Sequence, residues 1–207
     1  MDRQISIPLG RPFSISDRDI DVAFPLDVDE SCQDIQVLEK AAKLDLSIPR
    51  AQSTSLTAFL HILRLRRIES SIQQNIYRVD ERVEVTDAEI DTYLGELEKW
   101  KKLIPLDAKG QYDRDSVAFY GYDYYVSILS CEKYADQNAN VLKMVFYYKC
   151  HRLLLYPLIS QPQVNQRYLK ACVDVCGGVA QTYKRLHQTL SVGYSLMALQ
   201  TVFMAGK

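Results

Sequence analysis

Apolar residues recur every three or four positions along most of this 207-residue chain, which is the spacing of one face of an α-helix. The clearest stripe consists of Phe59, Ile62, Leu65, Ile68, Ile72 and Ile76. It predicts one long amphipathic helix across residues 52–79. No stretch of any length shows the alternation that is typical of β-strands. The sequence therefore predicts an all-α fold, an irregular bundle of about six to seven helices.

Start and stop signals define the other helices. The sequence Thr86-Asp87-Ala88-Glu89 is a capping box, which predicts a helix start, and Pro105 predicts the end of that helix. Further helices are predicted over about 115–135, 138–157, 164–188 and 190–205, the second of them ending at Pro157. The last is apolar nearly all round, so we expect it to lie centrally in the core.

The first thirty residues have a different character. They are rich in Pro, Asp and Ser and show no helical period. We therefore expect an extended segment over residues 1–30, followed by a helical domain over residues 31–207.

Composition excludes several classes of protein. With 25 basic and 26 acidic residues the net charge is −1, whereas a domain that grips DNA phosphates by itself is usually clearly basic. The five cysteines have no framework spacing and follow no secretory signal, which favours reduced thiols in the nucleus or cytoplasm. No apolar run reaches the roughly 18 residues of a membrane span.

Four blocks of sequence resemble one family. The run from Asp2-Arg3 through Gly10-Arg11-Pro12 to Asp19-Ile20-Asp21-Val22 resembles the "D-R-x-x-S … G-R-P … I-x-D-x-D-I-D-V" run in the middle homology region of fungal zinc-cluster transcription factors. The other blocks, which match the family in the right order, are Phe146–Pro157, Tyr168–Ala180 and Gln200–Gly206. We take Gly10, Arg11, Pro12, Asp19 and Asp21 as the family motif residues.

The resemblance carries expectations about function. In the family the Gly-Arg-Pro run lies well inside the regulatory region, so we expect this chain to correspond to the second half of such a region, as a truncated or a natural short form. The C-x2-C-x6-C start of the family's zinc cluster does not occur here, so we expect no DNA binding by the chain itself. The resemblance implies an effector-responsive regulatory fragment, whose partners are a full-length homologous regulator or a second copy, and a small apolar effector.

A tyrosine-dense run suggests where an effector would bind. Residues 119–125 place aromatic rings around most of a helix circumference, which fits either core packing or an aromatic pocket between helices. The pocket candidates are Tyr120, Asp123, Tyr124, Tyr147, Tyr148 and His151. The alternative function is a stand-alone binding protein, or a shape-driven cyclase, of fungal secondary metabolism, which works by orienting its substrate. We assign no catalytic residue, no metal and no cofactor.

The remaining features have structural interpretations. Cys172 and Cys176 share a helix face, but His187 lies too far along the axis to join them on one ion, so buried thiols are the better explanation. Cys150 and His151 are adjacent and point about 100° apart on a helix, which argues against a nucleophilic pair. We expect the basic patch of Arg64, Arg66 and Arg67 to be solvated, and likewise the acidic run of Asp17, Asp19, Asp21, Asp27, Asp29 and Glu30, which could also supply the N-cap of the next helix.

Overall fold

The computed structural model of the chain consists of α-helices joined by irregular segments. It describes residues 6–7, 9–44, 54, 56–77, 85–103, 135–189 and 196–206. The described helices are α2 (Ile35–Ala42), α3 (Thr57–Ile76), α4 (Asp87–Lys102), α7 (Ala135–Ile159), α8 (Gln166–Thr189), α9 (Leu196–Ala205) and the short 3-10 helix η1 (Asp17–Asp19). No strand occurs in these ranges. The predicted all-α fold is confirmed, whereas the helix predicted over 115–135 lies outside the described residues.

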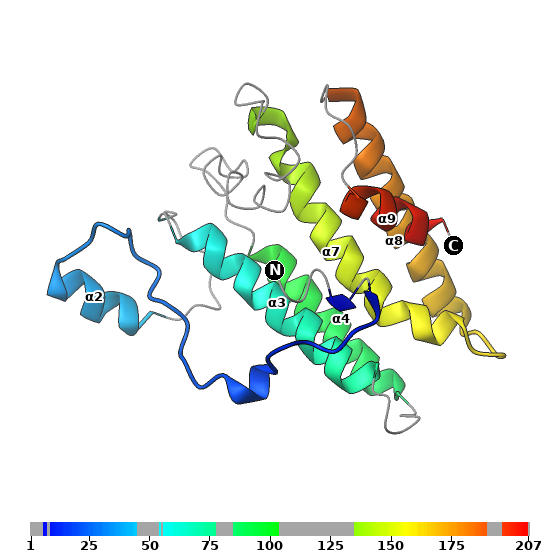
Figure 1. The fold of residues 1–207 in the computed structure, drawn as a ribbon, viewed down its shortest axis with the longest axis horizontal. Helices are drawn as coiled ribbons and strands as arrows, with labels where there is room; N and C mark the ends of the chain where they lie inside the picture. Colours follow the sequence, from blue (N-terminus) through cyan, green and yellow to red (C-terminus); the bar gives the residue numbers. More distant parts are fainter. Residues whose placement is uncertain are drawn as a thin grey trace.

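Four long helices lie side by side and form the body of the structure (Figure 1). Helices α3, α4 and α7 contact one another, α8 packs along α7, and the short helix α9 lies against α8. Helix α2 stands apart from the other helices on one side of the molecule. The helices therefore form a layered body with one projecting arm.

Helix α4 begins as its capping box predicts. The Thr86 hydroxyl accepts a hydrogen bond from the Glu89 amide at 3.3 Å, and the Glu89 carboxylate accepts one from the Thr86 amide at 2.9 Å. These two bonds satisfy amide groups that a helix start otherwise leaves without an intrahelical partner. The helix ends at Lys102, three residues before the predicted stop at Pro105.

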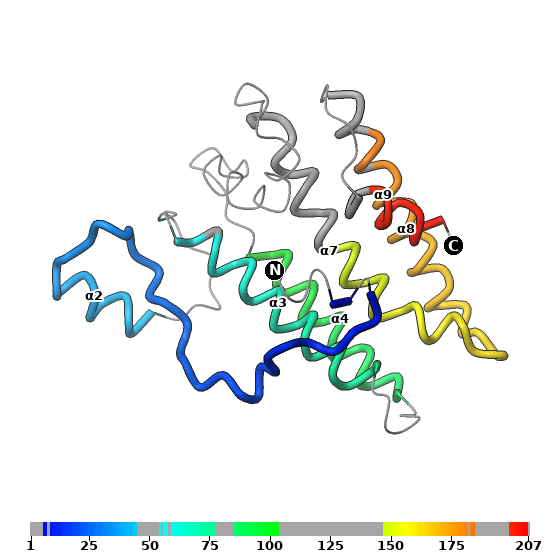
Figure 2. The backbone as a smooth tube through the Cα atoms, in the orientation of Figure 1, coloured from blue at the N-terminus to red at the C-terminus, as the bar shows by residue number. Residues whose placement is uncertain are grey.

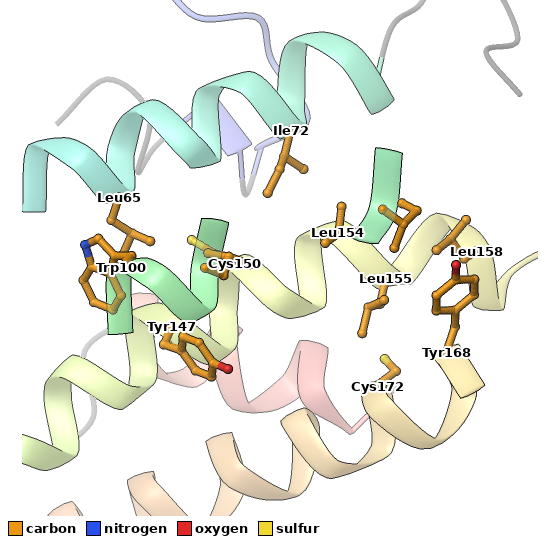
Figure 3. Close-up of a cluster of buried hydrophobic side chains, with 12 residues drawn as sticks. Leu65, Ile72, Trp100, Tyr147, Cys150, Leu154, Leu155, Leu158, Tyr168 and Cys172 are labelled. Atoms are coloured by element: carbon orange, nitrogen blue, oxygen red, sulfur yellow. The ribbon is translucent and has the colours of Figure 1, made fainter. Parts of the chain in front are cut away.

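The core lies where α3, α4, α7 and α8 meet, and its side chains point toward one another from all four helices (Figure 3). It consists of Leu65, Ile72, Ile90, Leu97, Trp100, Tyr147, Cys150, Leu154, Leu155, Leu158, Tyr168 and Cys172. Each buried Leu or Ile contributes about 1.5–3 kcal/mol relative to exposure. The indole N–H of Trp100 donates to the His61 carbonyl at 2.8 Å, and the Trp100 ring stacks on the His61 ring. The stripe predicted for residues 52–79 is thus the inner face of α3.

The predicted helix end at Pro157 is wrong, because α7 continues through this proline to Ile159. A proline inside a helix cannot donate to the carbonyl four residues earlier, here that of Leu153. The hydroxyl of Tyr77, just after α3, donates to this carbonyl at 2.6 Å. A side chain that follows the end of α3 therefore replaces the hydrogen bond that Pro157 removes.

The predicted central position of the last helix is also wrong. Helix α9 begins at Leu196, and its side chains Leu199 and Phe203 are 52% and 61% exposed. One contact that holds it is the Arg152 Nε–H, which donates to the Met204 carbonyl at the α9 C-terminus at 2.8 Å. An all-round apolar helix is expected to be buried, but Leu199 and Phe203, four positions apart on α9, lie on an exposed face.

Residues 9–30, here called the N-terminal strap, run antiparallel to α3 (Figure 2). Ser16 Oγ accepts from the Gln74 side chain at 3.0 Å, and the Arg67 guanidinium lies 4.0 Å from the Phe24 ring centroid. Nearer the α3 N-terminus, Asp27 accepts from the hydroxyls of Thr54 at 2.6 Å and Thr57 at 2.7 Å. The described part of the strap has no long helix, and these three contacts are among those that tie it to the body.

These contacts correct two expectations about charged residues. Arg66 is half-buried and pairs with buried Glu69 at 2.6 Å, whereas Arg67 is exposed and lies over the Phe24 ring. Asp27 is buried, while the following Asp34 caps α2 by accepting from the Gln36 amide at 2.9 Å. The hydroxyl donors of Asp27 lie 27 and 30 residues along the chain, so a local sequence pattern does not reveal them.

Among the described residues no helix combines the length and the apolarity needed to cross a membrane.

Candidate functional site

Three of the six predicted pocket residues meet on α7. The Tyr147 ring lies 5.5 Å from the Tyr148 ring in an edge-on contact and 4.3 Å from the His151 ring. Tyr147 and His151 are both buried. They are four positions apart on the helix and therefore lie on the same face. The other three candidates, Tyr120, Asp123 and Tyr124, lie outside the described residues. We call Tyr147, Tyr148 and His151 with the α4 residues Glu98 and Lys101 the aromatic cluster.

Helix α4 contributes two charged groups to this cluster. The Tyr147 hydroxyl donates a short hydrogen bond to the Glu98 carboxylate. The Lys101 ammonium lies 4.7 Å from the centroid of the Tyr147 ring, within cation–π range. Sequence reasoning missed both residues. The available signal was their three-residue spacing on one helix, which places them on one face but does not say what that face meets.

Burial controls the ionisation of the cluster. Burial lowers the pKa of His151 to about 4; the Glu98 carboxylate opposes this shift and the Lys101 ammonium adds to it. The imidazole is therefore neutral at pH 7. Burial, then the hydrogen bond to Glu98, raises the pKa of Tyr147 above its usual value. His151 Nε2 has no hydrogen-bond partner within the described part of the chain.

A glycine on α8 makes room for the cluster. A Cβ atom placed on Gly178 would lie 2.6 Å from Cζ of the Tyr148 ring, which is closer than such atoms approach. The ring of Tyr148 therefore rests directly on the α8 backbone. The neighbouring Gly177 has open space at the same atom. Only Gly178 is required by the packing, a distinction that the Gly-Gly sequence could not make.

The cysteines lie in environments that do not favour thiolate chemistry. Burial raises the pKa of Cys150 well above its usual value, so this group is a neutral thiol at pH 7. Burial and the neighbouring Cys176 raise the pKa of Cys172 to about 11. In the ranges that the structure covers, no three His, Cys, Asp or Glu side chains come together in a way that could hold a metal ion.

The first family motif forms a helix stop. Gly10 has a φ of +61°, and the Gly10 and Arg11 amides donate to the Ile7 and Ser6 carbonyls at 3.1 and 2.9 Å. This pair of bonds is a Schellman cap, which favours glycine at the left-handed position, and Pro12 prevents the helix from resuming. Arg11 and Pro12 are exposed. The Gly-Arg-Pro motif thus ends a short helical turn.

The second family motif lies on the strap. Asp19 closes η1, its amide donating to the Ser16 carbonyl at 3.0 Å, and Asp21 is exposed two residues later. The structure separates these motif residues from the aromatic cluster, which α4, α7 and α8 form.

Fold and cluster together define the class of protein: an α-helical domain with a strap along one helix and a group of aromatic and ionisable side chains between three others. Residues 1–102, just under half of the chain, match the family model described as the fungal specific transcription factor domain. The resemblance inferred from the Gly-Arg-Pro and Asp-Ile-Asp-Val motifs is confirmed, because both motifs lie within the matched residues.

Two curated proteins of Saccharomyces cerevisiae are similar to the whole chain. An uncharacterized transcriptional regulatory protein and the pyrimidine pathway regulatory protein 1 are each 24% identical over 212 aligned residues. The chain spans only 13% and 21% of the length of these relatives. No solved structure matches the chain significantly.

Proposed function

We propose that this chain is a regulatory region of a fungal transcription factor and that it responds to a small effector through helix packing. The match of residues 1–102 to the fungal specific transcription factor domain supports the role in transcription. The similarity to one relative named as a transcriptional regulatory protein, and to a second named as a pathway regulatory protein, supports it as well. A regulator of transcription works in the nucleus, so we propose that location.

The observation that carries the effector proposal is the unsatisfied nitrogen of His151. Burying a polar group without a partner costs about 1–3 kcal/mol, so a ligand hydroxyl or amide that reaches Nε2 gains more than its contact alone. Tyr147 and Tyr148 supply ring surface beside it. An effector with a mainly apolar or aromatic body and one neutral polar group suits this environment.

Binding at the aromatic cluster would reach three helices. The Tyr147 hydroxyl and Glu98 join α7 to α4, while the Tyr148 ring joins α7 to α8 at Gly178. A ligand that moves either ring changes how these helices pack. The effector thereby alters the surface offered to a full-length homologous regulator or to a second copy. With a net charge of −1, the chain relies on such a partner for contact with DNA.

A reporter experiment tests the proposal. The full chain is fused to an unrelated helix-turn-helix DNA reader, and transcript from a promoter with the matching operator is measured in a fungal host. We expect His151→Phe, which keeps a ring but removes Nε2, to change the transcript level several-fold. Tyr156→Phe, on an exposed aromatic residue of the same helix, is the control and leaves the level unchanged. Equal levels for all three proteins would contradict the effector proposal.

The alternative, a stand-alone binding protein or shape-driven cyclase, would use the same cluster. Incubation of the purified chain with polyene and terpenoid substrates, followed by mass spectrometry of the products, tests that prediction separately.

A further inference from the structure

The strap contains a stretch that the structure holds at both ends and leaves exposed in the middle. Its ties fall on Ser16, Phe24 and Asp27. Asp19, Ile20, Asp21 and Val22 lie between the first two ties and are all exposed. Val22 is 72% exposed and Ile20 40% exposed. The four residues Asp19–Val22 are here called the strap bow.

The spacing of the ties accounts for this exposure. Gln74 and Arg67, which hold the strap, are seven residues apart on α3, a distance of about 10 Å along the axis. Their partners Ser16 and Phe24 are separated by eight residues, which reach up to about 28 Å when extended. The short helix η1 takes up only part of the excess. The intervening residues must therefore bow away from α3, as the blue tube does in Figure 2.

The composition of the bow matches its exposure. Acidic and apolar residues alternate along it, and Ile20 has an extended backbone at φ −112° and ψ 108°. Asp19 ends η1, and beyond it alternate residues of the extended chain point to opposite sides, so Asp21 lies on the opposite edge from Ile20 and Val22. Exposed side chains of this size have no role in the core that Figure 3 shows, which α3, α4, α7 and α8 build without the strap.

We propose that the strap bow is a docking segment for a protein partner whose groove has an apolar floor and a rim of lysine or arginine side chains. Ile20 and Val22 enter the groove, and Asp19 and Asp21 face its basic rim. Alternating acidic and apolar residues are the composition of segments that recruit partners in transcription, so this proposal extends the proposed function to the partner it takes. The partner is a protein because the bow offers carboxylates, which repel nucleic acid and anionic lipid alike.

A matched pair of double variants tests the segment. Asp21→Asn with Val22→Ser removes one carboxylate and one apolar side chain from the bow. Val173→Ser with Asp174→Asn makes the same two chemical changes on the exposed face of α8, where Val173 is 62% exposed. Both double variants change the net charge from −1 to 0, so a non-specific charge effect acts equally on both.

The probe is a synthetic amphipathic helical peptide whose leucine stripe is flanked by lysines, which presents the apolar floor and the basic rim of the proposed partner; it is titrated against the full chain by fluorescence anisotropy. We expect the bow variant to weaken binding about tenfold, the effect of losing about two buried methyl groups, and the α8 variant to leave it unchanged. Raising the salt concentration should weaken binding of the unaltered chain more than that of the bow variant. Equal affinity for the bow and α8 variants overturns the proposal.

The reporter fusion then separates this proposal from the proposed function. A reporter that is active with the unaltered chain and with the bow variant alike overturns the docking segment and leaves the regulatory role intact. Loss of peptide binding in the bow variant together with a silent reporter for the unaltered chain supports the docking segment and contradicts the regulatory role. Circular dichroism of both variants, with helix content expected to equal that of the unaltered chain, confirms that the fold is kept.

Discussion

Two individual groups influence the stability of the fold, and the first is the carbonyl group of Leu153. Pro157 removes its helical donor, and the Tyr77 hydroxyl supplies another. Burial raises the pKa of Tyr77 above its usual value, so the hydroxyl keeps the proton that it donates. The hydrogen bond therefore links the end of α3 to the last turns of α7.

This link predicts a coupled pair of substitutions. Tyr77→Phe should lower the free energy of unfolding by about 1–2 kcal/mol, because the half-buried carbonyl of Leu153 loses its donor. In a Pro157→Ala background the amide of residue 157 can donate to Leu153, so the same change should cost about 1 kcal/mol less. Urea unfolding of the four proteins in this double-mutant cycle measures the coupling. Additive effects would show that Tyr77 acts through packing alone.

The second place is the imidazole of His151, whose pKa falls from 6.5 to about 4 on folding. The folded state binds its proton less tightly than the unfolded state, so the contribution is complete above pH 6.5. As the pH falls from 6.5 towards 4, the free energy of unfolding decreases by about 3 kcal/mol in total, because the unfolded state takes up the proton first.

We therefore expect acid to destabilise the unaltered chain more than a His151→Gln variant. Between pH 7.5 and pH 5 the difference in free energy of unfolding between the two proteins should shift by about 2 kcal/mol in favour of the variant. Both proteins carry the same carboxylates, so the comparison cancels their titration. A difference that does not vary with pH would mean that His151 is charged or exposed in the folded state.

At the scale of the helices, the contact of α7 with α8 depends on Gly178, which has no side chain. Tyr148 rests on the backbone at Gly178, so this pair of helices approaches more closely there than a Cβ atom would permit. Close approach of α8 also brings Tyr168 to Asp87 at the start of α4, at 2.8 Å.

The adjacent glycines predict opposite outcomes for one substitution. Gly178→Ala should destabilise the chain by about 1–3 kcal/mol, because the new methyl group displaces the Tyr148 ring. Gly177→Ala has open space and should stabilise α8 by up to about 1 kcal/mol, since alanine favours a helix over glycine. Thermal unfolding of the two variants, followed by circular dichroism, measures both. Similar changes in the two variants would mean that α7 and α8 lie farther apart.

At the scale of the whole molecule, the strap runs along α3 from the C-terminal end of this helix, where Ser16 contacts Gln74, to its N-terminal end, where Asp27 contacts Thr57. Asp27 is the buried anchor of that connection, with Thr54 and Thr57 as its hydroxyl donors. Because the strap adds no residue to the main core, its attachment and the stability of the helical body are largely separate properties.

Asp27→Ala should therefore free the strap without unfolding the body. We expect amide hydrogen exchange to rise at least tenfold at Val28, whose amide donates to the Leu26 carbonyl at 3.0 Å beside Asp27, and to stay unchanged at the core positions of α7. Asp19→Asn, on an exposed carboxylate of the same strap, is the control and should leave exchange unaltered. Equal protection in the Asp27 variant would show that Ser16 and Phe24 suffice to hold the strap.

The sequence alone determined where α3, α4 and α8 form. The stripe of α3 and the capping box of α4 are local patterns, because helix hydrogen bonds and caps join residues four positions apart or fewer. The same locality let the motif residues Gly10 and Asp19 indicate the family that residues 1–102 match. Sequence also selected Tyr147 and His151, although it could not say what they contact.

Tertiary structure decided everything that depends on a distant partner. Whether α7 continues past Pro157 depended on Tyr77, 76 residues from the carbonyl it serves, and whether Phe203 is buried depended on how α9 packs. Glu98 and Lys101 entered the aromatic cluster because α4 lies beside α7, a fact that neither helix encodes by itself. The physical reason is that burial and hydrogen bonding each need two residues in contact. A periodic sequence shows which face of one helix is apolar, but not which residues of another helix that face meets.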